Sequence, residues 1–171
     1  MKELVGIAEQ IAAQLVKRKQ TIAVVESSTG GLIAASLLAV PGASAYFKGG
    51  AVVYTREARR LLMDIPDEAM KGIRSASEPY AKLLAEQMRR RFETDWGLSE
   101  TGATGPTGNR YGDAAGHSCM AVAGPQAQVI TLETGSSDRL ATTVMWDCTA
   151  GRFSWFYEDE EDAHVLSLIH I

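Results

Sequence analysis

The stretch TIAVVESSTGGLIAASLLAV, residues 21–40, determines the fold that the rest of the chain completes. Its first part, Thr21 to Val25, is short and rich in β-branched residues, which predicts a buried strand. Glu26 to Gly31 follows as a polar turn ending in two glycines, and Leu32 to Val40 is an apolar run of helical character. The stretch therefore predicts a strand–turn–helix unit, the repeating element of α/β domains.

The sequence on either side continues this alternation. Apolar residues recur at helical spacing before residue 20, and Ser77-Glu78-Pro79 is a helix-start signal for a stripe that runs to Glu93. The expected elements are helices at 4–20, 56–63 and 78–93, strands at 50–55 and 98–102, and a hairpin of strands at 117–123 and 128–132. Crossovers between parallel strands place helices on both faces of a sheet. We therefore predict a three-layer α/β/α sandwich with a mixed, mostly parallel sheet.

The end of the chain does not fit this pattern. A closing amphipathic helix is expected after Arg139, yet no helical period survives in residues 147–163. The last residues, LSLIHI, match the in-frame translation of a common transposase sequencing adapter, so residues 166–171 are expected to be a non-native tail. If the reading frame was also lost before the adapter, part of the stretch from about Thr142 onward is non-native as well. The expected organisation is a single domain at 1–165.

Composition and charge exclude several classes of protein. Of 171 residues, 46% are apolar and 22% charged, as in ordinary globular domains. A net charge of −4 gives no general attraction to nucleic acid, and no apolar stretch reaches the ~20 residues that span a membrane. Cys119 and Cys148 form no CxxC pair, which indicates reduced thiols and a cytoplasmic protein. The histidines are scattered, so no metal site is expected.

Two glycine-rich loops after predicted strands are the candidate ligand sites. In residues 26–31, ESSTGG, a strand leads through two serines to a helix N-terminus, which favours a phosphate or an oxyanion. Simple helix capping explains the same serines as well. The second loop, Thr101 to Asn109, is neither a P-loop nor a dinucleotide fingerprint, and a plain wide turn explains it equally. Open α/β sheets bind ligands at the carboxyl ends of strands, so the two loops can share one crevice.

Several motifs together resemble one known family. Residues 26–62, ESSTGGLIAASLLAVPGASAYFKGGAVVYTREARRLL, are similar to a signature of the form ESCTGG, then PGSS-A-F-GG, then Y-S-N-E-A-K. Residues 75–79 are similar to AVSEP, residues 101–106 to TGIAGP, and residues 137–139 to GDR. Over about residues 4–139 the chain thus resembles the CinA C-terminal domain family. Thr104 and Asn109 differ from the commonest form of the family loop.

This resemblance implies an α/β/α domain, often oligomeric, so that a homo-oligomer is possible. Active members hydrolyse the carboxamide of nicotinamide mononucleotide to nicotinate mononucleotide and ammonia, in a scheme that needs neither metal nor cofactor. The family's serine nucleophile falls on Ser27 and its lysine base on Arg59, in the motif that Tyr54 opens. These three are the candidate catalytic residues. The candidate substrate-binding residues lie in the two loops and the GDR-like motif: Glu26, Ser28, Thr29, Gly30, Gly31, Thr101, Gly102, Thr104, Gly105 and Arg139.

Arginine at position 59 changes the expected chemistry. A lysine acts as a base once its pKa is lowered to ~7–8. A neutral guanidine at pH 7 costs roughly 7.5 kcal/mol or more, from a pKa of ~12.5–13.8 at ~1.36 kcal/mol per unit. Arg59 can instead clamp a phosphate or carboxylate. Lys48 is not expected to replace the base, because nothing in the sequence brings its amine to Ser27.

Two hypotheses therefore stay open. The first is a serine amidohydrolase acting on a pyridine nucleotide, with backbone N–H groups at 29–31 or 102–105 holding the oxyanion. The second is a catalytically impaired relative that binds a nucleotide or another small anion through the same loops, with Arg59 and Arg139 supplying charge. A role on DNA finds no basic surface to support it.

Overall fold

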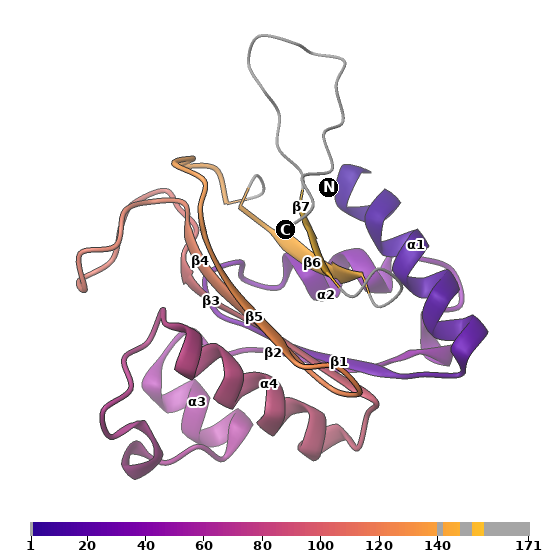
Figure 1. Cartoon of the computed structure of the whole chain (residues 1–171), viewed down its shortest axis with the longest axis horizontal. Coiled ribbons are helices and arrows are strands. Elements are labelled where there is room, and N and C mark those ends of the chain that lie inside the picture. The colour runs from indigo at the N-terminus through magenta and orange to yellow at the C-terminus, as the bar shows by residue number, and fades with distance from the viewer. Residues whose placement is uncertain (1, 140–141, 148–151, 156–171) are drawn as a thin grey trace, which may run out of the picture.

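A five-stranded sheet forms the centre of the fold, and a separate two-stranded sheet accompanies it (Figure 1). The computed structural model describes residues 2–139, 142–147 and 152–155. The strands are β1 (Ile22–Glu26), β2 (Phe47–Val52), β3 (Trp96–Ala103), β4 (His117–Ala123), β5 (Gln128–Glu133), β6 (Val144–Asp147) and β7 (Arg152–Trp155). The helices are α1 (Lys2–Arg18), α2 (Leu32–Leu38), α3 (Arg56–Met63) and α4 (Glu78–Phe92), with short 3-10 turns η1 (Ala43–Ala45) and η2 (Asp67–Met70).

The central sheet is mixed and has the order β2-β1-β3-β4-β5. β1 pairs in parallel with β2 and β3, whereas β4 runs antiparallel to both β3 and β5. All strands of this sheet except β4 therefore point the same way. Figure 1 shows α1 and α2 on one face of the sheet and α3 and α4 on the other. The predicted three-layer α/β/α sandwich is confirmed, as is the predicted hairpin of β4 and β5.

The alternation of side chains along β1 builds a core on each face of the sheet. Ile22 and Val24 belong to the core under α1 and α2, and Ala23 and Val25 to the core under α3 and α4. Every residue of β1 is buried, because neighbouring strands and both helix layers cover it. The β-branched run at residues 21–25 thus lies in an interior strand of the sheet.

Two segments differ from the sequence-based expectation. The second strand covers Phe47–Val52 rather than 50–55, so that the turn-like Gly49 and Gly50 lie inside it. A side chain at Gly49 would place its Cβ 2.2 Å from the Phe92 ring of α4, which explains the glycine. After Arg139, the described residues form the antiparallel pair β6 and β7 instead of a closing helix. The expected non-native tail at 166–171 lies outside the described residues.

The chain direction brings three loops to one edge of the sheet. β1 leads into α2 on one face, and β2 leads into α3 on the opposite face, which is the arrangement that opens a crevice beside a central strand. β3 ends at the same edge and continues into the loop at 104–116. Within the described residues, none of the helices has the length and apolar character needed to cross a bilayer.

Candidate functional site

A cavity of about 530 Å³ lies where β1, β2 and β3 end, and we call it the main cavity. Its wall consists of Ser27, residues 53–56 with Arg59, residues 75–76 with Tyr80, Thr101 with Gly102, and residues 109–111. Three of these residues are arginines, at positions 56, 59 and 110, and none is an acid. A smaller hollow of about 350 Å³ adjoins it and shares Arg56, Arg59, Ser75 and Tyr111. The size and charge suit a small anionic ligand.

Ser27 is the first residue after β1 and is half-buried in the wall of the main cavity. Its N–H group donates to Glu100 Oε2 at 3.0 Å, which fixes the backbone at this point. Its hydroxyl makes no hydrogen bond with any residue in the described part of the chain. The Ser27 hydroxyl is therefore positioned at the cavity and free to meet a ligand.

The Glu26 side chain bonds to the backbone at the beginning of α2. Its buried carboxylate accepts hydrogen bonds from the N–H groups of Gly31 (3.0 Å), Ile33 (3.1 Å) and Ala34 (2.8 Å), at the beginning of α2. A carboxylate is well placed there, because the first N–H groups of a helix lack intrahelical partners. Glu26 therefore already accepts from N–H groups of the helix N-terminus that was expected to favour a phosphate or oxyanion.

Glu100, on β3, is a buried residue that sequence reasoning missed. Its carboxylate accepts from the N–H groups of Ser27 and Thr29, each at 3.0 Å, and from the Ser28 hydroxyl. Burial raises the pKa of Glu100, although the hydrogen bonds from Ser28, Thr29 and Ser27 oppose that rise. The Thr29 hydroxyl lies between the two carboxylates, 2.7 Å from Glu26 and 2.9 Å from Glu100. Ser28 and Thr29 are therefore held inside the protein and do not line the main cavity.

The second glycine-rich loop divides into a part at the cavity and a part away from it. Thr101 and Gly102 line the cavity, and Thr101 Oγ1 accepts from the Ala76 N–H at 3.2 Å. Thr104 instead donates its hydroxyl to the Ser28 carbonyl at 2.8 Å. Gly105 has a φ of 135°, and a Cβ there would meet the Ser137 carbonyl at 2.2 Å. This half of the loop therefore packs against the backbone at Ser28 and at Ser137.

Arg139 contacts this half of the loop and does not line the main cavity. Its Nη2 donates to the Gly105 carbonyl at 2.9 Å, and its Nη1 would lie 3.5 Å from a Cβ at Gly30. The predicted binding residues Gly30, Gly31, Gly105 and Arg139 are thus close to one another but outside the cavity lining. Of the described residues of the two loops, Ser27 from the first and Thr101, Gly102 and Asn109 from the second line the cavity.

Arg59 lines the main cavity from α3, and its side chain is only 4% exposed. Its Nε donates to the Ile65 carbonyl at 3.2 Å, and its Nη2 forms an ion pair with Asp67. The Nη1 group has no hydrogen-bond partner among the described residues. The guanidinium is therefore fixed by internal contacts while one donor group remains for a ligand. Tyr54, the third candidate catalytic residue, lines the same cavity and is 70% exposed.

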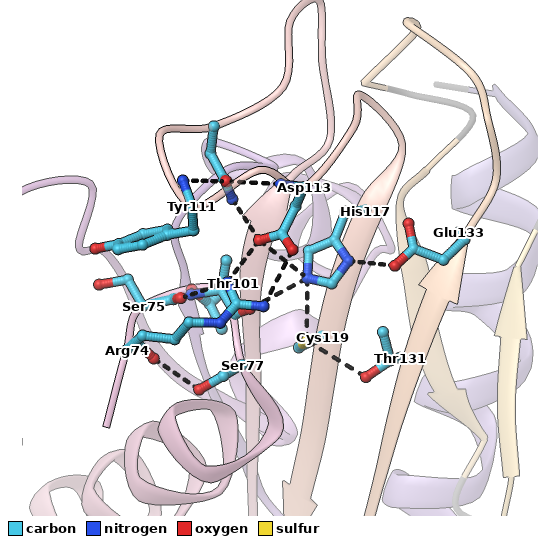
Figure 2. Close-up of polar contacts among 12 residues, drawn as sticks. Arg74, Ser75, Ser77, Thr101, Tyr111, Asp113, His117, Cys119, Thr131 and Glu133 are labelled. Atoms are coloured by element: carbon cyan, nitrogen blue, oxygen red, sulfur yellow. Dashed lines mark hydrogen bonds and ion pairs between the residues drawn. The ribbon is translucent and has the colours of Figure 1, made fainter. Parts of the chain in front are cut away.

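The loop at 104–116 supplies cavity residues that the motifs did not reveal. The Asn109 side chain accepts from the N–H groups of Tyr111 (2.9 Å) and Asp113 (3.2 Å), which folds the segment into a tight turn. Asp113 forms a two-point ion pair with Arg74, at 2.6 and 3.0 Å, as Figure 2 shows. The spacing of Asn109 and Asp113, with Gly112 between them, is the sequence signal from which this turn could have been predicted.

Next to the loop, His117 on β4 joins the turn to the sheet (Figure 2). Its Nδ1 lies 2.5 Å from Glu133, its Nε2 lies 3.1 Å from the Ala76 carbonyl, and Asp113 is 3.7 Å away. Cys119 is buried against His117 and Thr131, and burial raises the pKa of its thiol. In the part of the chain that the structure describes, no group of three or more His, Cys, Asp or Glu side chains has an arrangement suited to a metal ion.

Comparisons with known proteins agree with the fold and the motifs. Residues 5–154 match the family profile described as the CinA C-terminal domain. A CinA-like protein of Gloeobacter violaceus is 37% identical over 131 residues, which cover 76% of this chain and 31% of that protein. One from Synechococcus sp. is 42% identical over 105 residues, covering 61% of this chain and 25% of the relative. The chain thus corresponds to about a third or less of these relatives.

Solved structures give the same result. The crystal structure of the competence/damage inducible protein CihA from Agrobacterium tumefaciens has a TM-score of 0.72 and 25% identity, and the match covers 81% of this chain and 86% of that one. A competence damage-inducible protein A from Klebsiella pneumoniae shares the fold with a TM-score of 0.71 at 24% identity, covering 76% and 81%. From the matched profile, the sequence relatives and the shared fold, we conclude that the chain belongs to the CinA C-terminal domain family.

Proposed function

We propose that the protein hydrolyses the carboxamide of nicotinamide mononucleotide, with Ser27 as the nucleophile. The observation that carries this proposal is that Ser27, with an unbonded hydroxyl, faces a cavity lined by three arginines and no acid. Guanidinium groups suit a phosphate monoester, and tyrosines at positions 54, 80 and 111 offer flat surfaces to a pyridinium ring. The family resemblance supplies the reaction.

The reaction proceeds through an acyl-enzyme. Ser27 Oγ attacks the amide carbon, ammonia leaves, and water then releases nicotinate mononucleotide. The N–H groups at 29 and 31 donate to Glu100 and Glu26. We therefore expect side chains to stabilise the charge that develops on the carbonyl oxygen. Thr101 is suited to this role: its Oγ1 accepts from Ala76, which leaves its proton to donate. β1 and β3 run side by side, with Val25 opposite Ser99, toward Ser27 and Thr101.

A second candidate function is ligand binding without hydrolysis, and Arg59 favours it. Arg59 stands where the family has its lysine base, and a guanidinium does not act as a base near pH 7. Its ion pair with Asp67 instead holds the guanidinium in the wall of the cavity. The cavity would then hold a nucleotide or another small anion through its arginines.

Incubation of the protein with nicotinamide mononucleotide separates the two functions. Ammonia release is followed by a coupled assay, nicotinate mononucleotide by mass spectrometry, and binding by calorimetry. Turnover supports the amidase, and binding without turnover supports the second function. A protein that neither binds nor converts this nucleotide would contradict the amidase and restrict the second function to another small anion.

Restoring a lysine at position 59 is expected to raise ammonia release by at least about tenfold when its counter-ion is removed as well. The double variant Arg59→Lys with Asp67→Asn buries an amine without an acid beside it, which lowers its pKa toward that of a useful base. The matched control is Arg60→Lys with Asp67→Asn, because Arg60 is 56% exposed and lies 3.8 Å from the same carboxylate. Equal rates in the two double variants would show that position 59 has no part in proton transfer.

A further inference from the structure

The smaller hollow of about 350 Å³ has no part in the reaction proposed above. If the amide of the nucleotide meets Ser27, as the proposed function requires, the pyridine ring and its ribose lie in the main cavity. Ser27 does not line the smaller hollow, so the reacting amide does not enter it. Ligand sites in proteins have volumes of ~300–1,000 Å³. The smaller hollow is therefore large enough to hold a ligand group of its own.

The wall that the two hollows share carries Arg56, at the beginning of α3, and Arg59, one turn later. Both positions differ from the family motif Y-S-N-E-A-K, which has asparagine at the first and lysine at the second. The Arg56 side chain is exposed and has neither a hydrogen bond nor an ion pair with any described residue. Its guanidinium is therefore available to an anionic group that lies where the two hollows meet.

Beyond this shared wall, the smaller hollow has the features of a nucleoside site. Met70 and Ile73 are partly buried against the core under α3 and α4, and they give the hollow an apolar side. Asp67 is the one acid among the described residues that line either hollow, and its side chain is 57% exposed. A nucleobase packs against apolar side chains, and a carboxylate accepts hydrogen bonds from ribose hydroxyls.

The Tyr111 ring is held in the wall that both hollows share. The guanidinium carbon of Arg74 lies 5.5 Å from the ring centre, and Arg74 is itself fixed by its two hydrogen bonds to Asp113, at 2.6 and 3.0 Å. Figure 2 shows Arg74 and Ser75 beside this ring. Tyr111 is 39% exposed, so a ligand that passes from one hollow to the other packs against it.

We propose that the protein binds a pyridine dinucleotide across the two hollows and hydrolyses its carboxamide. The pyridine half lies in the main cavity with its amide at Ser27, the pyrophosphate lies at Arg56 and Arg59, and the second nucleoside lies in the smaller hollow. The hydrolysis rests on the proposed function, because the reacting groups are the same. The amide C–N bond breaks as Ser27 Oγ bonds to the carbon, and water then releases the acid. One water is consumed for each ammonia formed, and the pyrophosphate stays intact.

Nicotinamide adenine dinucleotide tests the proposal beside nicotinamide mononucleotide. The wild type is expected to bind the dinucleotide at least about tenfold more tightly, because its second nucleoside binds as a tethered group. Calorimetry measures both affinities. Turnover is expected to give ammonia, followed by a coupled assay, and nicotinate adenine dinucleotide, followed by mass spectrometry. Equal or weaker binding of the dinucleotide would overturn the proposal.

Met70→Trp separates the smaller hollow from the main cavity. The larger side chain fills the smaller hollow, so it is expected to lower the affinity for the dinucleotide at least about tenfold more than that for the mononucleotide. Leu61→Trp is the matched control, because Leu61 is 70% exposed on α3 and lines neither hollow. An equal loss for both nucleotides would place the mononucleotide itself in the smaller hollow and contradict the proposal.

Arg56→Gln tests the place of the pyrophosphate. Loss of a charged donor is expected to weaken dinucleotide binding by about tenfold. Arg60→Gln is the control, because Arg60 is 56% exposed on the same helix and lines neither hollow. Equal affinities of these two variants would show that the pyrophosphate does not lie at Arg56.

The same measurements distinguish failure of this inference from failure of the proposed function. Turnover of the mononucleotide without binding of the dinucleotide would overturn the inference and leave the amidase intact. Dinucleotide binding that Met70→Trp abolishes, with no turnover of either nucleotide, would overturn the amidase and retain the binding site across the two hollows.

Discussion

Replacing Ser27 by alanine is expected to lower ammonia release from nicotinamide mononucleotide by at least about 10³-fold in kcat. The substitution removes the atom that forms the acyl-enzyme, and binding alone cannot replace a covalent route. Binding of the nucleotide is expected to persist, because the arginines of the cavity are untouched. Stability should also persist, since the Ser27 hydroxyl makes no hydrogen bond within the described residues and only its backbone N–H contacts Glu100. Rates and calorimetric affinities of the two proteins check both expectations.

The control for this experiment is Ser44→Ala, which makes the same chemical change at an exposed residue of η1. Its rate should equal that of the wild type. Mass spectrometry of the wild type, quenched during turnover, should detect nicotinate mononucleotide esterified through its carboxyl group to Ser27 if release of the acyl group is slow. Full activity in Ser27→Ala would mean that another group in the cavity performs the attack, and the amidase mechanism described above would be wrong.

The elements that sequence predicted best are those that local patterns determine. The helix at Arg56–Met63 and the strand at His117–Ala123 have the predicted bounds, and the start of α4 follows the Ser-Glu-Pro signal closely. The strand predicted at 50–55 begins earlier, at Phe47, and the prediction missed this because Gly49 and Gly50 resemble a turn. Packing against Phe92 requires a glycine at position 49 inside the strand. A contact between residues 43 positions apart leaves no mark in a local window.

The same contrast between local patterns and long-range contacts applies to the residues of the candidate site. Ser27, Thr101 and Gly102, which the motif resemblance selected, lie at the ends of their strands and line the cavity. The resemblance also selected Glu26 and Arg139, whose side chains lie outside the cavity lining, because a motif does not show which way a side chain points. Glu100 and Tyr111 were missed for a different reason. Glu100 acts on a loop 71–73 residues away in the chain, and the Tyr111 contacts depend on how the 104–116 loop folds over Arg74.

Glu100→Ala is expected to lower the free energy of unfolding by about 3–5 kcal/mol. The substitution leaves the N–H groups of Ser27 and Thr29 and the Ser28 hydroxyl without their acceptor, and it opens a hole in a fully buried place. Glu9→Ala on the exposed side of α1 is the control and should cost far less. Urea unfolding of the three proteins measures the difference. A loss near that of the control would show that the turn at 27–31 does not depend on Glu100.

The Glu100→Gln variant separates the hydrogen bonds of this residue from its charge. Burial raises the pKa of Glu100 above the ordinary 4.5, so between these two values the folded protein holds a proton that the unfolded chain has released. Wild-type stability should therefore fall as pH rises from about 4.5 through the raised pKa of the folded state. Glutamine does not titrate, so the unfolding free energy of Glu100→Gln minus that of the wild type should increase over the same window. A difference that is constant with pH would mean that Glu100 is ionised in the folded state at no cost. In that case the hydrogen bonds of Ser27, Ser28 and Thr29 would fully offset its burial, and the turn that carries the nucleophile would be held by a charge.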